Sequence, residues 1–294
     1  MDAGPRRFMT LLLTGAPCAG KSTIADMLER RLTGHHTRVI VVREVATALI
    51  LAGGGRMEPI EFQRQILATQ VRLENEACEA AEALSADGYD VLIVLDRGRR
   101  DGKIFCDAST WAAIGGDEVE EGQYDIIAHL TSLAVDAPAT FDDAQRQGQN
   151  AAREYTRAQC ATMCPQFRTL YTGAPVVTLT GSTRPVVYKL RRLLEVLRHR
   201  IPHSMMELQL RITAEIVRLP GNMDRVSVYQ PGGPVLSHRQ IVAMPLHSDE
   251  HVDDTGGGDD SGGSEGRPTD LDTCSPKGFV GRLSDASPRP RTYR

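Results

Sequence analysis

The chain has 294 residues, of which 41% are hydrophobic and 24% are charged, and its formal net charge is −4. This composition is typical of globular proteins, and the small net charge gives no reason to expect a nucleic-acid partner. No stretch approaches the roughly 18 consecutive apolar residues of a membrane-spanning helix. The six cysteines form no CxxC pair, so we expect reduced structural thiols in a cytoplasmic protein.

Predicted strands alternate with predicted helices over the first two thirds of the chain. Residues 8–14 (FMTLLLT) are typical of a strand buried on both faces, and we interpret them as a core strand, not a signal peptide, because they lead directly into a glycine-rich motif. Residues 58–86 carry apolar side chains at helical spacing, among them Phe62, Ile66 and Ala77. The alternation predicts an α/β fold, a parallel sheet with helices on both faces. The other predicted strands cover 37–43, 90–98, 124–130 and 174–180, and the other predicted helices cover 20–33, 142–164 and 184–200.

The pattern changes after residue 200. Residues 207–230 predict one or two short strands around a Pro-Gly-Asn turn, which is too little to bury a core of its own. From residue 247 the sequence is rich in Gly, Ser and Asp, which predicts a disordered tail. We therefore expect a main domain over 1–202, a short β-rich remnant of a second domain over 203–246 and a tail over 247–294.

Residues 15–22 read GAPCAGKS and match the phosphate-loop pattern G-x-x-x-x-G-K-S/T in full. The motif lies between a predicted strand and a predicted helix, where backbone N–H groups and the positive helix end can face phosphate oxygens. In this interpretation Lys21 reaches the β- and γ-phosphates and Ser22 offers its hydroxyl to Mg²⁺. The alternative is an ordinary glycine-rich turn. The residues predicted to bind the nucleotide are Gly15, Ala16, Pro17, Cys18, Ala19, Gly20, Lys21, Ser22 and Thr23.

An aspartate ends the predicted strand VLIVLD, at Asp96. A carboxylate at the tip of a strand beside a phosphate loop is suited to hold Mg²⁺ through its water shell. The alternative is a strand-end aspartate that caps a turn. Next to a complete phosphate loop, we favour the metal role, shared with Ser22.

Further charged residues follow the strands at the same edge of the sheet. Glu44 follows the second predicted strand, and Arg97 and Asp101 follow the third in the sequence DRGRRD. A carboxylate there is suited to accept a proton from a substrate hydroxyl, and an arginine to hold a phosphate or a ribose. The alternative for Glu44 is a charge at a helix N-terminus that interacts with the helix dipole.

Two helical segments carry polar side chains at helical spacing. Gln63 and Gln70 are seven residues apart, so they face one way, either toward a base or sugar or toward solvent. Arg146, Arg153 and Arg157 also share one predicted helix face. Such a basic helix is able to close over a triphosphate and stabilise charge during transfer, and the alternative is a solvated charged face. Of the three arginines, we count Arg153 among the candidate catalytic residues.

These segments resemble the P-loop domain family shared by NadR-type kinases and TRPL-translocation-defect-type GTPases. The resemblance covers about residues 8–200 and implies a kinase-like P-loop NTPase fold with a five-stranded parallel sheet in the order 2-3-1-4-5. It implies Mg-nucleotide bound at residues 15–23, Asp96 near magnesium, a lid that carries Arg153, Glu44 as a base and Arg97 as a substrate-holding residue. The stretches that carry it are GAPCAGKST, VVREVAT, FQRQILATQ, VLDRGRRD, KIFCDASTW, YDIIAHL and AAREYTRAQ.

The sequence departs from the pattern of this family in two places. Its fifth predicted strand ends in LTGST, where the family pattern leads us to expect Asp-Asn, which leaves base recognition at that edge open. Relatives of the TRPL-translocation-defect type usually continue into a second β domain, and we expect that domain to be truncated or absent in this sequence.

We therefore predict a P-loop protein that uses Mg²⁺ and ATP or GTP. The leading hypothesis is a phosphotransferase that moves the γ-phosphoryl group to a small, nucleoside-type hydroxyl acceptor, with Lys21, Glu44, Arg97 and Arg153 as catalytic residues. The alternative is a regulatory switch protein that hydrolyses the nucleotide slowly and acts through a partner or lipid. A third alternative is an inactive remnant, against which the intact phosphate loop argues. The acceptor, the preferred base and the oligomeric state are left open.

Overall fold

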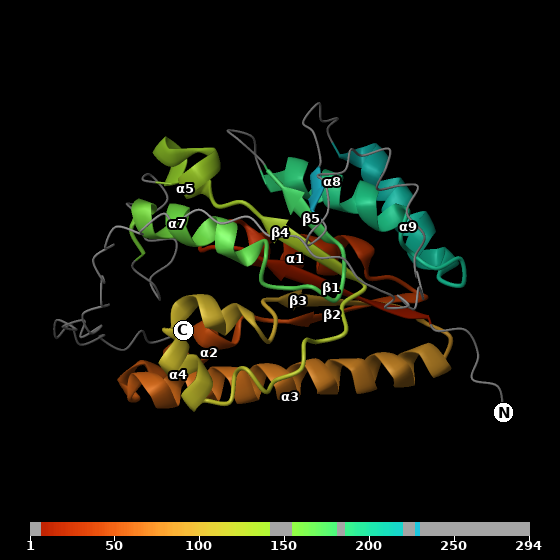
Figure 1. The fold of residues 1–294 in the computed structure, drawn as a ribbon. Helices are drawn as coiled ribbons and strands as arrows, with labels where there is room; N and C mark the ends of the chain where they lie inside the picture. The colour runs from red at the N-terminus through yellow and green to blue at the C-terminus, as the bar shows by residue number, and fades with distance from the viewer. Residues whose placement is uncertain (1–6, 142–154, 181–185, 220–226, 230–294) are drawn as a thin grey trace, which may run out of the picture. The chain divides into compact units, whose positions relative to one another are not determined.

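The computed structural model describes residues 7–141, 155–180, 186–219 and 227–229 (Figure 1). Arg146, Arg153 and the predicted tail over 247–294 lie outside the described residues, as does the first part of the helix predicted over 142–164. The described strands belong to one six-stranded sheet.

Five parallel strands form most of this sheet, in the order β2-β3-β1-β4-β5. This confirms the predicted strand order and the predicted α/β P-loop fold. A short sixth strand pairs antiparallel with β5, with Tyr229 opposite Val176. The strands are β1 (Phe8–Thr14), β2 (Thr37–Val42), β3 (Asp90–Asp96), β4 (Ile126–Leu130), β5 (Val176–Leu179) and β6 (Ser227–Tyr229).

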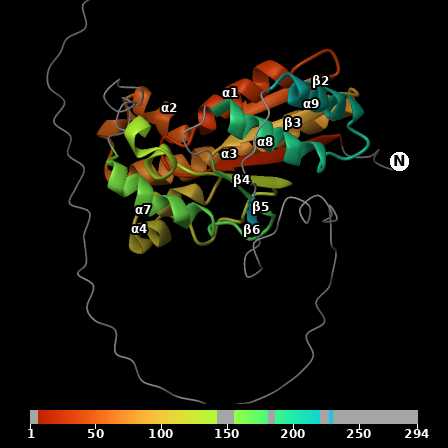
Figure 2. The same cartoon turned by 90° about the horizontal axis from the view of Figure 1, so that it is seen from above.

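Helices cover both faces of the sheet, as the alternating sequence pattern predicts (Figures 1 and 2). The helices α1, α8 and α9 share one core cluster with the sheet, whereas α3 packs on the other face. Among the described residues, none of the helices is long and apolar enough to cross a membrane. The helices are α1 (Lys21–Leu32), α2 (Val45–Leu51), α3 (Pro59–Ala86), α4 (Ala108–Ala113), α5 (Leu133–Asp136), α7 (Arg157–Phe167), α8 (Val186–Arg198) and α9 (Met206–Arg218), with 3₁₀ turns η1 (Gly54–Arg56) and η2 (Asp101–Phe105).

The central strand β1 supplies side chains to both core clusters. Met9, Leu11 and Leu13 pack with α1, α8 and α9, whereas Leu12 packs with α3. Alternate residues of a strand point to opposite faces, so a strand covered by helices on both sides needs apolar residues at consecutive positions. This is why the run FMTLLLT predicts a central strand.

One prediction about the end of the chain is wrong. Residues 207–218, half of the segment predicted as short strands over 207–230, belong to the helix α9, whereas β6 is a short strand as predicted. Leu208, Ile212 and Ile216 are buried at helical spacing and pack in the cluster of α1 and α8. The division of the chain at residue 202 stays a prediction, although α9 shares the core of the preceding domain.

Candidate nucleotide-binding site

The glycine-rich motif forms the loop between β1 and α1, where a phosphate loop is expected. Gly15 has a φ of +139°, and a Cβ atom there would lie 2.3 Å from the backbone oxygen of Leu130 in the neighbouring strand. Gly20 precedes α1 in the left-handed conformation, with a φ of +88°. Both positions therefore require glycine because of their backbone conformation, and Gly15 requires it also because a side chain there would meet the backbone of Leu130. These two requirements explain why the motif has glycine at its first and sixth positions.

The lysine of the motif folds back over the loop. The Nζ atom of Lys21 donates hydrogen bonds to the carbonyl oxygens of Gly15, at 3.1 Å, and Ala16, at 3.2 Å. The side chain is buried, and this desolvation, together with the charge of Arg97, lowers the pKa of Lys21 to about 8. The amine thus lies in the loop with two neutral acceptors, and bound phosphate oxygens would be stronger partners for it.

The two residues predicted to hold magnesium are in contact with each other. Ser22 Oγ donates a hydrogen bond of 2.5 Å to Asp96 Oδ2. Asp96 is 1% exposed, and its Oδ1 atom is buried with no hydrogen-bond partner among the described residues. An unpartnered buried carboxylate oxygen is costly unless a ligand or an ion completes the site. One hydroxyl and one carboxylate beside a phosphate loop fit Mg²⁺, which takes its remaining ligands from phosphates and water.

Arg97 connects the loop to the acidic residues of the neighbouring strand ends. Its guanidinium group bonds to Glu44 through Nε, to Asp101 Oδ2 at 3.2 Å and to the carbonyl oxygen of Gly15 at 3.2 Å. Burial lowers the pKa of Arg97, but the charges of Glu44 and Asp101 outweigh burial and raise it above the usual value. Glu44, predicted from its place after the second strand, therefore lies beside the phosphate loop with a fixed cation next to it.

A group of aromatic rings covers the guanidinium group of Arg97. The ring centroids of Phe105 in η2 and Phe167 in α7 lie 4.8 Å and 5.6 Å from its Cζ atom. Tyr155 packs against Phe105, with the ring centroids 6.0 Å apart. The rings shield the ion pairs of Arg97 from water, which strengthens these pairs. Sequence inspection missed the aromatic residues because single aromatic side chains carry no motif.

Asp101 is held inside the protein and does not reach solvent. Thr14 Oγ1 and Tyr171 OH donate to its Oδ1 atom at 2.8 Å and 2.6 Å. Burial raises the pKa of Asp101, and the charge of Arg97 opposes this rise. The residue is 1% exposed. Of the two carboxylates beside Arg97, Glu44 is therefore the more accessible one, with a side chain that is 17% exposed.

The glutamines of α3 have different surroundings. Gln70 is buried and donates hydrogen bonds of 2.9 Å to the backbone oxygen of Arg97 and to Glu74. Arg97 has a φ of +94°, a left-handed conformation that is unusual for a residue other than glycine. The Gln70 amide thus supports the strained backbone of Arg97, whereas the expected contact with a base or sugar stays a prediction. Gln63 lies near Gly102 of η2.

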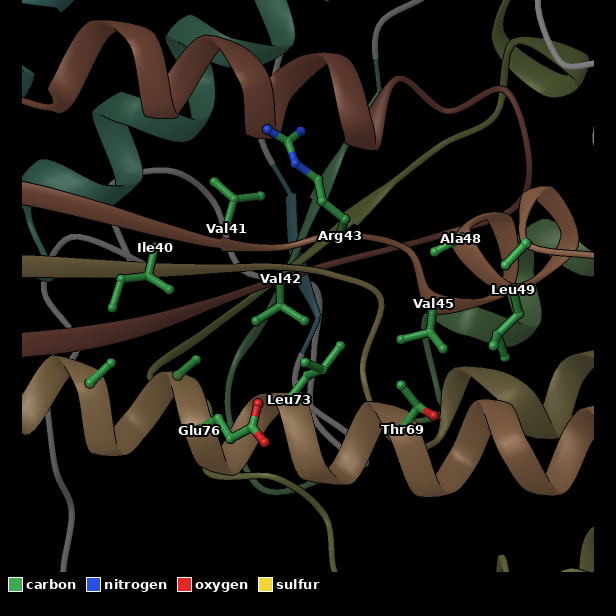
Figure 3. Close-up of a pocket in the computed structure, with 13 residues that line it drawn as sticks. Ile40, Val41, Val42, Arg43, Val45, Ala48, Leu49, Thr69, Leu73 and Glu76 are labelled. Atoms are coloured by element: carbon green, nitrogen blue, oxygen red, sulfur yellow. The ribbon is translucent and has the colours of Figure 1, made fainter.

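A cavity of about 620 Å³ lies behind α2, between this helix, β2 and α3 (Figure 3). Val42, Val45 and Leu73 point into it, and Arg43 points toward α1 (Figure 3). The residues of α2 that line it are Val45, Ala48 and Leu49, and Ala52 lines it directly after the helix. Thr47 instead bonds to Glu44, on the side of the phosphate loop. The cavity and the candidate site thus lie on different faces of α2.

Comparison with families of known proteins agrees with this geometry. The model of an AAA domain family matches residues 10–183, which is more than half of the chain. The chain belongs to this AAA domain family. It is therefore a P-loop nucleotide-binding protein, as the resemblance implied, and proteins of this type bind their nucleotide with Mg²⁺. No curated protein matches the chain.

Proposed function

We propose that the chain is a Mg²⁺-dependent phosphotransferase that transfers the γ-phosphoryl group of ATP or GTP to a hydroxyl group of a small, nucleoside-type acceptor. One observation carries the proposal. The carboxylate of Glu44 is linked through Arg97 to the carbonyl oxygen of Gly15, so a candidate base lies beside the first residue of the phosphate loop. A switch protein that only hydrolyses its nucleotide has no acceptor hydroxyl to deprotonate, so a carboxylate in this place favours transfer over hydrolysis.

The phosphate loop would bind and neutralise the triphosphate. Backbone N–H groups of residues 15–23 would face the phosphate oxygens, and Lys21 would exchange the carbonyl oxygens of Gly15 and Ala16 for the β- and γ-phosphates. Ser22 and Asp96 would hold Mg²⁺, which supplies charge neutralisation at the phosphates when it is bound.

Glu44 would take the proton of the acceptor hydroxyl. Thr47 Oγ1 donates to its Oε2 atom at 2.6 Å, and Arg97 bonds to Oε1, so the carboxylate is held in one orientation. Because Arg97 directs Nε at Glu44 and Nη1 at Asp101 and the carbonyl oxygen of Gly15, we assign it the positioning of Glu44 and the loop. Arg153 stays a candidate for contact with the γ-phosphate.

The test follows the label of γ-labelled ATP and GTP in the presence of Mg²⁺ and a panel of nucleosides, nicotinamide riboside and nucleoside monophosphates. Label on an acceptor, absent with Lys21→Ala, is the expected result. Glu44→Gln should reduce transfer by roughly a hundredfold with nucleotide affinity unchanged, because it removes a base and keeps the shape. Asp117→Asn, at an exposed residue of the same charge, is the matched control.

Three outcomes would contradict the proposal. Transfer that survives unchanged in Glu44→Gln would exclude this residue as the base. Full nucleotide binding and turnover in Lys21→Ala would exclude the phosphate loop as the site. Tight nucleotide binding with slow release of inorganic phosphate and no labelled acceptor would favour a regulatory switch protein.

A further inference from the structure

Helix α9 has apolar residues on two faces. Its inner face carries Leu208, Ile212 and Ile216, which are buried in the core cluster of α1 and α8. Its outer face carries Met206, Leu210 and Val217, which are 64%, 60% and 80% exposed. Since successive helical residues are about 100° apart, these three side chains fall within roughly 40° of one another around the helix axis. They form an apolar stripe, which we call the outer stripe.

An outer stripe of this kind is unusual for a helix that already covers a core. Figures 1 and 2 show α9 beside α8, on the face of the sheet that α1 covers. A helix in this position needs one apolar face, and its other face is normally polar. Exposed apolar side chains scattered singly need no explanation, but three aligned on one helix face indicate a contact surface.

Charged residues along one flank of the outer stripe indicate what covers it. Glu207 lies in the first turn of α9 and Arg218 at its end, and both follow a residue of the stripe by one position, so they lie on the same flank. When two identical helices pack antiparallel about a two-fold axis, the same flank of each helix faces its counterpart with the ends exchanged. Glu207 of one copy would then lie opposite Arg218 of the second copy, twice per pair.

The apolar residues of the outer stripe also fit an antiparallel pair with a two-fold axis. With the axis near the middle of α9, Met206 of one copy lies opposite Val217 of the second, and Leu210 lies opposite the small residues Thr213 and Ala214. Large side chains thus meet smaller ones, as packing of helix ridges into grooves requires. In a parallel two-fold pair, each flank faces the opposite flank of the second copy, so Glu207 and Arg218 do not meet.

We propose that the outer stripe of α9 binds a second copy of this chain as an antiparallel, two-fold symmetric helix pair. A self-complementary patch is the requirement for such an interface. The helix has 13 residues and is about 20 Å long, so its contact is smaller than the roughly 800 Å² per partner of a stable complex. The dimer is therefore weak and forms at micromolar concentration or above.

Sedimentation equilibrium of the full chain, from about 5 to about 300 µM, tests this proposal. We expect a reversible monomer–dimer equilibrium that Leu210→Glu abolishes, with circular dichroism unchanged because Leu210 is exposed. Leu51→Glu is the matched control, since Leu51 is 79% exposed but lies on α2. A wild-type chain that stays monomeric over this range overturns the proposal. So does a dimer that persists in Leu210→Glu.

A charge exchange tests the antiparallel orientation. Glu207→Lys and Arg218→Glu each bring two like-charge contacts into their own homodimer, so each should dimerise roughly tenfold more weakly than the wild type. In a mixture of the two variants, the two substituted side chains would face each other with opposite charges, and so would the two unchanged ones. Arg218→Glu also removes the ion pair of Arg218 with Glu215 in the same helix. The heterodimer should therefore form more tightly than either homodimer of the variants. No gain on mixing would overturn the antiparallel pairing.

If the outer stripe is instead protected from solvent in a monomer, residues after 229 cover it and the proposal is wrong.

Discussion

The phosphate loop and the cluster around Arg97 adjoin at the carbonyl oxygen of Gly15 but are built in different ways. The hydrogen bonds of the loop are largely local: Lys21 bonds to the carbonyl oxygens of Gly15 and Ala16, five and six residues earlier in the chain. The Arg97 cluster joins Glu44 after β2, Asp101 in η2 and Tyr171 before β5. A local structure can be identified from a short motif, whereas an assembled one depends on the whole fold.

The largest expected effect is at Gly15, where the loop is tested directly. Gly15→Ala places a Cβ atom 2.3 Å from the backbone oxygen of Leu130, in a strand that cannot move aside. We expect it to lower the free energy of unfolding by about 3 kcal/mol or more, because both the clash and the left-handed conformation oppose a side chain. Thermal or urea unfolding measures the change, and nucleotide binding should be lost with it.

The control for this substitution is Gly55→Ala. A Cβ atom at Gly55 meets nothing within 4 Å and needs no left-handed backbone. This variant should stay within about 0.5 kcal/mol of the wild type. Equal stability of Gly15→Ala and Gly55→Ala would mean that the loop is not held against β4 as described.

An intermediate effect is expected at Tyr171, which supports the Arg97 cluster through its hydrogen bond to Asp101. Tyr171→Phe removes the 2.6 Å hydrogen bond to Asp101 and leaves a buried carboxylate with one donor fewer. We expect a loss of about 1–3 kcal/mol in the free energy of unfolding and a reduced transfer rate, because Asp101 holds Arg97 and Arg97 holds Glu44. Unfolding and transfer assays measure the two effects.

Tyr89→Phe is the matched control for the lost hydroxyl. Tyr89 keeps its ring against the guanidinium group of Arg38 at 4.1 Å in this variant, and we expect a change within about 0.5 kcal/mol. If Tyr171→Phe changes stability but leaves transfer and its dependence on Glu44 intact, the Arg97 cluster supports the fold but not the reaction.

The same contrast explains how much could be predicted from the sequence. The five parallel strands and the long helix α3 were predicted because buried strands read as apolar runs and long helices as a periodic pattern. Helices as short as α2 or α4 carry no clear period. In α9, apolar residues occupy every second position at Leu208, Leu210 and Ile212, which is the pattern of a strand. The pattern misleads because Leu210 belongs to the outer stripe and only Leu208 and Ile212 are buried in the core.

Within the site, the residues of the motif could be predicted, and their supports could not. Lys21 and Ser22 follow from the spacing of the phosphate loop, and Asp96 and Glu44 from their places at the ends of strands. The contacts of Tyr171 with Asp101 and of Gln70 with Arg97 join residues 70 and 27 positions apart. No local pattern encodes contacts at such separations, because they arise from the packing of whole elements.

The last expected effect depends on pH and concerns the charge of Lys21. Burial lowers its pKa to about 8 from the ordinary value of 10.5. Between these two values the folded, nucleotide-free protein has lost a proton that the unfolded chain retains. The unfolded state then binds more protons, so the contribution of Lys21 to stability becomes less unfavourable as the pH rises from 8 to 10.5.

Nucleotide binding should show the opposite dependence on pH. Phosphate oxygens favour the charged amine, so binding above pH 8 takes up a proton at Lys21, and affinity should fall by up to roughly tenfold per pH unit. Calorimetric titration in buffers of different ionisation enthalpy measures this uptake. Lys21→Arg stays charged over the whole range and should bind without proton uptake, whatever its affinity. A wild-type chain with the same pH profile as Lys21→Arg would mean that the buried amine keeps its charge in the free loop, and that the carbonyl oxygens of Gly15 and Ala16 compensate its desolvation.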